Sequence, residues 1–153
     1  FIVDKEIDEI YVKGEALIDQ EIQKVGDIDT AVVLMKYVDS TIAVIDNSRK
    51  SAYGYDQRIE VFGSKGMIQA NNVKVDNSKL YNQNGIISSL PMDFFLKRYM
   101  EAYKIEIQDF VDSVINNREV SVTGIDGLKS LQIGLAAKKS LLENRPVKII
   151  EIK

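Results

Sequence analysis

The chain has 153 residues, of which 45% are apolar and 28% charged, so it is expected to fold as one soluble domain rather than to be disordered. Its net charge of −3, with Lys and Arg scattered among Asp and Glu, supplies no basic stripe for a nucleic-acid backbone. Because both cysteine and histidine are absent, disulfides, thiolate nucleophiles, Ser-His-Asp catalysis and His- or Cys-ligated metals are excluded, and a reducing, cytoplasmic compartment fits.

The first third of the chain alternates apolar and polar residues as β-strands do. One strand is expected around residues 7–12, and a polar loop follows over residues 19–29. The segment Thr30 to Val38 is apolar on both alternating faces, and residues 41–45 return beside it as a hairpin. A strand that is apolar on both faces must be covered on both faces.

Two further hairpins are expected in the middle of the chain. Residues 58–62 and 67–70 flank the turn Gly63 to Gly66, which is not a phosphate loop because no helix N-terminus follows it. Residues 73–89 have the composition of short polar edge strands around a turn at residues 82–85.

The last third of the chain predicts two long helices and a final strand at residues 147–152. The first helix runs from about Met92 to Asn117, with a stripe that is expected to be buried: Phe95, Tyr99, Tyr103, Ile107, Phe110, Val111 and Val114. The second helix begins at a capping box of Thr123 and Asp126 and stops before Pro146. Its expected buried stripe consists of Leu128, Leu131, Leu135 and Leu142.

This order of elements predicts the α+β class, with a largely antiparallel open sheet that has two long helices on one face. In a monomer the other face of the strand at residues 30–38 would expose an apolar patch, so we expect a second subunit to cover it. The chain begins at Phe1 without an initiator methionine, and it is expected to be part of a longer protein.

Candidate binding residues gather in the segment AVIDNSRKSAYGYDQR at residues 43–58. Tyr53 and Tyr55 offer hydroxyl groups from rigid rings, and Asn47 and Arg49 precede them, a set that suits a polyhydroxylated ligand. The same run also suits a strand pair with a solvated face, with Tyr53 in a cross-strand aromatic contact. Asn47 and Arg49 could equally pair with neighbouring aspartates. A hydrolase that uses Asp46 and Asp56 has little support, because carboxylates in turns are usually solvated.

Three stretches, in order, resemble the C-terminal domain of the glucose-fructose oxidoreductase and inositol dehydrogenase family, closest to its NAD-dependent inositol 2-dehydrogenase branch. The similarity runs from about Asp29 onward. The three stretches are IAVIDNSRKSAYGYDQRIEVFGSKGMIQ, RYMEAYKIEIQDFVDSV and VTGIDGLKSLQIGLAAKKSLLENRPVKI. The resemblance implies that residues 1–153 form a substrate-binding and oligomerisation domain. A dinucleotide-binding domain would then lie outside these residues.

The resemblance also implies how the parent enzyme works. Family members take the proton of a polyol hydroxyl with a lysine, an aspartate and a histidine, as hydride leaves for NAD. Since this chain has no histidine and no G-x-G-x-x-G turn, we expect that it neither binds NAD nor turns over substrate alone.

The Tyr-Gly-Tyr-Asp pattern of the family assigns Tyr55 as the polyol contact and Tyr53 as a weaker candidate. Asn47 and Arg49 could reach the same cleft. The family pairs its subunits through the open sheet, commonly into dimers and tetramers, so a homo-oligomer is implied. The alternative reading is a free-standing binding or assembly module that kept the fold without the chemistry.

Overall fold

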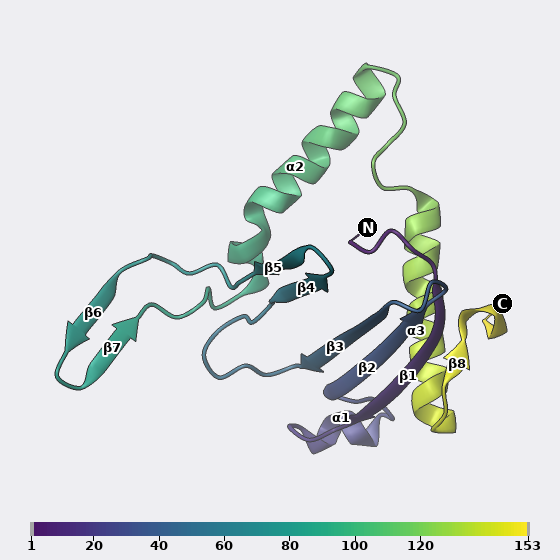
Figure 1. Cartoon of the computed structure of the whole chain (residues 1–153), viewed down its shortest axis with the longest axis horizontal. Helices are drawn as coiled ribbons and strands as arrows, with labels where there is room; N and C mark the ends of the chain where they lie inside the picture. Colours follow the sequence, from purple (N-terminus) through teal and green to yellow (C-terminus); the bar gives the residue numbers. More distant parts are fainter. Residues whose placement is uncertain (1, 153) are drawn as a thin grey trace. The chain divides into compact units, whose positions relative to one another are not determined.

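The computed structural model describes residues 2–152, and the chain divides into two compact units (Figure 1). Unit 1 contains the residues up to Lys50 and those from Val122 onward. Unit 2 contains residues 51–121, which form the teal and green middle of the ribbon. The expectation that residues 1–153 form one domain stays a prediction.

Unit 1 is built on a four-stranded antiparallel sheet with the strand order β3-β2-β1-β8. Its strands are β1 (Ile7–Glu15), β2 (Thr30–Tyr37), β3 (Ile42–Ser48) and β8 (Val147–Lys148). It also contains the helices α1 (Gln20–Lys24) and α3 (Gly124–Glu143) and a 3-10 turn, η1 (Ile149–Glu151).

Two short elements of unit 1 differ from the prediction. The expected loop at residues 19–29 contains α1, because the Asp19 carboxylate caps its first turn by accepting the N–H of Glu21 at 2.9 Å. The expected last strand is short, since the chain turns into η1 after Lys148. There the Glu151 carboxylate accepts the N–H of Lys148 at 3.0 Å and pairs with Arg145.

The core of unit 1 lies between one face of the sheet and α3. Its fully or nearly fully buried apolar residues are Ile10, Val12, Met35, Ala136 and Val147. Small residues of α3 allow the helix to lie close to the strands. Ser140 is buried there, and its hydroxyl accepts the N–H of Val12 at 3.0 Å and donates to the carbonyl of Arg145 at 2.6 Å.

The predicted capping box of α3 is confirmed, because the Asp126 carboxylate accepts both the N–H and the hydroxyl of Thr123. The predicted buried stripe of this helix is wrong, since its leucines are 44–74% exposed: Leu128, Leu131, Leu135 and Leu142. The helix presents Ala136 and Ser140 to the sheet instead. Periodicity located an amphipathic helix but not the side that meets the strands.

The opposite face of the sheet is apolar, and α3 does not cover it. The strand register places Tyr11, Leu34 and Val44 in one row across β1, β2 and β3. Leu34 is 43% exposed and Val44 is 62% exposed. On β2 these exposed positions alternate with Met35, which is buried on the α3 side. The predicted two-sided apolar character of this strand is therefore confirmed.

Unit 2 contains two hairpins and a long helix. Its elements are β4 (Ile59–Gly63) paired with β5 (Gly66–Ala70), β6 (Lys79–Asn82) paired with β7 (Gly85–Ser88), and α2 (Phe95–Ile115). The hairpins and the helix agree with the prediction. The buried stripe does not, because Ser113 is the one buried residue of α2 and most of the stripe is exposed.

Together the units give an α+β fold with antiparallel open sheets and two long helices, as predicted. No described apolar residue of unit 2 is fully buried within the chain, and two-stranded hairpins are marginally stable on their own. The exposed apolar surface of this unit is therefore of the kind that other polypeptide covers in a folded protein.

One carboxylate organises the connection from β1 to β2. Asp29 is 3% exposed and accepts the N–H groups of Leu17, Ile18 and Asp19 at 2.9, 2.8 and 2.9 Å. The Thr30 hydroxyl also donates to it at 2.8 Å. Burial opposes ionisation of Asp29, but these donors outweigh it and lower its pKa to about 2.

We expect Asp29 to stabilise the fold in a pH-dependent way. Because its pKa is lower in the folded chain than its unfolded value of roughly 4, its contribution is complete above pH ~4 and is lost as pH falls toward 2. Urea unfolding of wild type and Asp29→Asn should therefore differ most near neutrality, and the difference should shrink below pH ~4. The exposed Asp27→Asn in the same loop is the control and should change little. A constant difference between pH 7 and pH 2 would contradict this assignment.

Candidate functional site

The candidate site is the irregular segment between β3 and β4, which begins unit 2. Gly54 adopts a φ of +130°, and a Cβ atom built there would lie 2.8 Å from the carbonyl oxygen of Pro91. The next residue, Tyr55, donates its N–H to the carbonyl of Met92 at 2.7 Å. The segment is thus pressed against residues 91–92 just ahead of α2, and only glycine fits at position 54.

Tyr55 is half-buried against the first turns of α2. Its ring lies 5.9 Å from that of Tyr99 in an edge-on arrangement and 6.4 Å from that of Phe95. Hydrogen bonding to Tyr99, together with burial, raises the pKa of Tyr55. The phenol of Tyr55 therefore stays protonated at neutral pH and can donate a hydrogen bond.

Asp56 is the centre of a hydrogen-bond network beside Tyr55. Its carboxylate accepts a two-pronged contact from the Arg58 guanidinium, with N···O distances of 2.8 and 3.0 Å. The Tyr53 hydroxyl and the Asn72 amide also donate to it. Arg58, then Tyr53 and Asn72, hold the pKa of Asp56 well below its usual range. A carboxylate with so little affinity for a proton is unsuited to act as a general base.

Tyr53 contacts the rest of this segment through its hydroxyl group rather than its ring. Its hydroxyl donates to Asp56, and its ring makes no aromatic contact with the described residues. The cross-strand aromatic alternative for Tyr53 is therefore wrong. Tyr53 and Tyr55 both belong to the folded turn ahead of β4, and Asp56 directly follows Tyr55.

Arg98 is a member of this cluster that sequence reasoning missed. Its Nη2 donates to the carbonyl of Gln57 at 3.0 Å, and its guanidinium lies 5.8 Å from the centre of the Tyr99 ring. Its Nη1 is buried without a hydrogen-bond partner in the described residues. The available signal was a cation placed directly beside an aromatic residue of the helical stripe.

Asn47 and Arg49 belong to unit 1, at the end of β3. Asn47 lies opposite Ala31 of β2, and the backbone N–H of Arg49 donates to the carbonyl of Asp29 at 2.8 Å. Within residues 2–152 neither side chain makes a hydrogen bond or an ion pair, so the alternative pairing with Asp46 and Asp56 is not found. Their place in a ligand site stays a prediction.

A metal centre is not among the features of this part of the chain. Residues 2–152 contain no group of three or more acidic side chains placed to hold a metal ion. None of the helices described is long and apolar enough to cross a membrane. The chemistry of the site therefore consists of hydroxyl, amide and guanidinium donors beside one ion-paired carboxylate.

Comparison with known proteins gives consistent matches over nearly the whole chain. Residues 12–149 match the family described as "Oxidoreductase family, C-terminal alpha/beta domain". A myo-inositol 2-dehydrogenase from Thermotoga maritima is 45% identical over 99% of this chain and 46% of its own length. The inositol 2-dehydrogenase of Rhizobium meliloti is 36% identical over 97% of this chain and 45% of its own length.

Solved structures agree with the sequence matches. Scyllo-inositol dehydrogenase from Lactobacillus casei, solved with NAD(H) and scyllo-inositol, has a TM-score of 0.87 and 31% identity over 95% of this chain and 43% of that one. The chain spans about half the length of the curated relatives that it matches. The chain belongs to the oxidoreductase family of glucose-fructose oxidoreductase and inositol dehydrogenase, whose C-terminal alpha/beta domain it matches.

Proposed function

We propose that residues 1–153 are the C-terminal substrate-binding and oligomerisation domain of an NAD-dependent inositol 2-dehydrogenase-like oxidoreductase. The main support for this proposal is the 45% identity to the myo-inositol 2-dehydrogenase of Thermotoga maritima across 152 residues. The Lactobacillus casei relative, solved with scyllo-inositol and NAD(H), supports the same substrate class and cofactor. The nucleotide-binding part would lie outside this chain.

The reaction of such an enzyme oxidises one ring hydroxyl to a ketone. The carbon-bound hydrogen leaves as hydride to NAD⁺, and the hydroxyl proton passes to a base, giving the ketone, NADH and a proton. We expect no general base from this chain. It has no histidine, and Arg58 lowers the pKa of Asp56 so far that its carboxylate has little affinity for a proton. Its part in catalysis is to bind and orient the polyol.

The hydroxyl of Tyr55 is the group we assign to polyol binding, with Tyr53 as a second contact. Tyr55 is held by ring packing on Tyr99 and Phe95 and by its backbone bond to Met92, so its hydroxyl is fixed in place. A rigid neutral donor costs little conformational entropy when a ligand binds. Asn47 and Arg49 remain weaker proposals for the same substrate.

The proposed function can be tested with the complete protein that carries this chain. Addition of myo-inositol and NAD⁺ should produce NADH, seen as absorbance at the nicotinamide band, whereas residues 1–153 alone should give none. The isolated chain should also show no heat of NAD⁺ binding in calorimetry. If the complete protein lacks a nucleotide-binding part and stays inactive with inositols and other polyols, the non-catalytic binding module is the correct reading.

Replacement of Tyr55 by Phe in the complete protein removes one hydroxyl and keeps the aromatic packing. We expect kcat/KM for the polyol to fall about three- to tenfold, because a ligand hydroxyl loses its partner. The exposed Tyr81→Phe in the β6–β7 hairpin is a matched control and should leave the kinetics unchanged. Equal kinetics for wild type and Tyr55→Phe would remove Tyr55 from the site.

We further propose that the open face of the unit 1 sheet pairs with a second copy of the chain. Its apolar row of Tyr11, Leu34 and Val44 is flanked by the charged positions Lys13 and Asp46, which suits an apolar interface centre with a polar rim. An uncovered row of this kind is costly to leave in water. A two-fold related copy would present the same row in return.

Substitution of Leu34 by Glu places a charge at the centre of this face. We expect the mass measured by sedimentation velocity to fall toward that of a monomer, because a carboxylate cannot be buried there without a partner. Val25→Glu is the control, since Val25 is also an exposed apolar residue but follows α1 outside the sheet. An unchanged oligomer in Leu34→Glu would show that another surface holds the copies together.

A further inference from the structure

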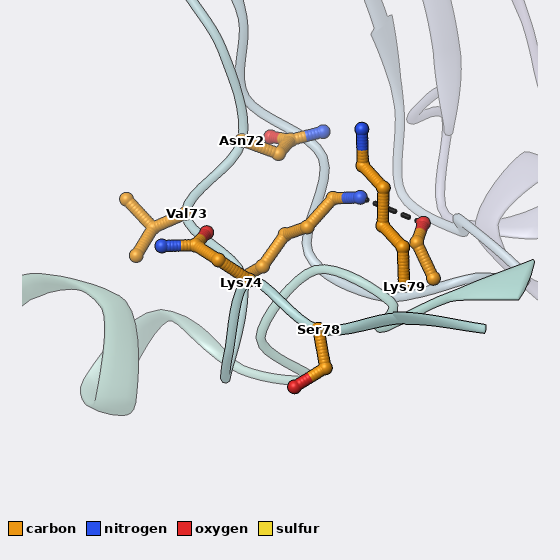
Figure 2. Close-up of a pocket in the computed structure, with 7 residues that line it drawn as sticks. Asn72, Val73, Lys74, Ser78 and Lys79 are labelled. Atoms are coloured by element: carbon orange, nitrogen blue, oxygen red, sulfur yellow. Dashed lines mark hydrogen bonds between the residues drawn. The ribbon is translucent and has the colours of Figure 1, made fainter.

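A polar pocket of about 610 Å³ lies in unit 2, apart from the residues assigned to polyol binding (Figure 2). Its volume is within the range of about 300–1,000 Å³ that small-molecule sites occupy. One lining residue, Val73, is apolar, and the others carry amides, hydroxyls or ammonium groups: Asn72, Lys74, Asn77, Ser78, Lys79 and Ser88. Such a lining suits a strongly polar ligand.

The two lysines of this pocket belong to two backbone segments, each held by its own strand pairing. Lys74 forms an isolated antiparallel bridge with Pro91, and the carbonyl of the preceding Val73 accepts the N–H of Met92 at 3.1 Å. Lys79 is the first residue of β6 and lies directly opposite Ser88 of β7. The two cations therefore come from different elements and meet at one pocket.

The side chains converge on one side of the pocket. In Figure 2 the ammonium groups of Lys74 and Lys79 and the amide of Asn72 lie toward the same side, whereas the Ser78 hydroxyl points away. The Lys74 ammonium donates to the Ser88 hydroxyl at 2.9 Å. Two positive charges and neutral hydrogen-bonding groups thus line one concave surface.

The positive charge of this pocket is not balanced by ion pairs. Within residues 2–152 neither Lys74 nor Lys79 forms a salt bridge, and no carboxylate lines the pocket. The acid of this loop, Asp76, lies within electrostatic reach of Lys74, but its carboxylate accepts hydrogen bonds from the Ser89 hydroxyl at 2.6 Å and the N–H of Ser78 at 2.7 Å. Asp56, which accepts a hydrogen bond from the lining residue Asn72, already forms an ion pair with Arg58.

We propose that this pocket binds a phosphorylated sugar or polyol. The phosphate lies between the ammonium groups of Lys74 and Lys79, where a divalent oxyanion relieves the repulsion of two like charges. The hydroxyl groups of the ligand meet the amides of Asn72 and Asn77 and the hydroxyl of Ser88. This site stands apart from the proposed oxidation of a neutral polyol, and it holds or fails independently of it.

Asn72 connects this site to the tyrosine segment. Its amide nitrogen donates to Asp56 at 2.6 Å, and its amide oxygen accepts the N–H of Gln57 at 2.7 Å. A ligand that bonds to Asn72 therefore contacts a residue that also holds the turn in which Tyr53 and Tyr55 lie.

The test is isothermal titration of the complete protein that carries this chain, with glucose 6-phosphate, glucose and inorganic phosphate as separate probes. We expect glucose 6-phosphate to bind at least tenfold tighter than glucose or phosphate alone, and to weaken as salt rises. Lys74→Gln and Lys79→Gln should each weaken it about tenfold, because each removes one charge-assisted contact. Lys65→Gln, in the β4–β5 turn of the same unit, is the matched control and should bind as wild type does.

Three results would overturn the proposal. Glucose binding as tightly as its phosphate would mean that the lysines recognise no anion. Inorganic phosphate binding as tightly as the sugar phosphate would mean a simple ion site without a sugar subsite. Equal affinity in wild type, Lys74→Gln and Lys79→Gln, or an equal loss in Lys65→Gln, would move binding elsewhere. Circular dichroism of each variant establishes that it is folded before its affinity is compared.

Discussion

The central constraint on this chain is a sheet that is apolar on both faces but covered on one. Helix α3 closes the first face through small residues, with Ala136 fully buried and Ser140 bonded to the backbone of β1. The second face keeps Leu34 and Val44 in contact with water. Covering this second face with other protein surface would bury apolar side chains and so add to the stability of the fold.

The candidate site achieves rigidity without regular secondary structure. Gly54 permits a backbone approach to Pro91 that a side chain would block, and Tyr55 is then fixed by Met92 and by two aromatic neighbours. Asp56 ties the following residues together through Arg58, Tyr53 and Asn72. These local contacts explain how a loop can hold hydroxyl donors in one geometry, which binding of a polyol requires.

Local patterns predicted those parts of the fold that local interactions determine. The hairpins follow from turn glycines, and the start of α3 follows from Thr123 and Asp126. The orientation of α3 could not be predicted, because its leucine stripe is the more apolar side while the sheet is met by Ala136 and Ser140. The side of a helix that is buried depends on tertiary contacts that periodicity does not reveal.

For the candidate site, too, the sequence indicated some of the residues and missed others. Tyr55 and Tyr53 stood out because hydroxyl-bearing aromatics in a polar turn have little use in a core. Arg98 did not, since an arginine on a helix normally reads as solvated; only the fold brings it to Gln57 and the Tyr99 ring. A pattern in sequence identifies residue types that suit a ligand, but contacts between distant segments decide which of them share a site.

The charge state of the tyrosine cluster is fixed across the physiological pH range. Tyr99 and burial raise the pKa of Tyr55, so its phenol stays neutral, while Arg58 keeps Asp56 ionised. With no histidine in the chain, no other side chain has an ordinary pKa between pH 5 and 8. The tyrosine cluster therefore presents the same hydrogen-bond donors and the same charges throughout that range.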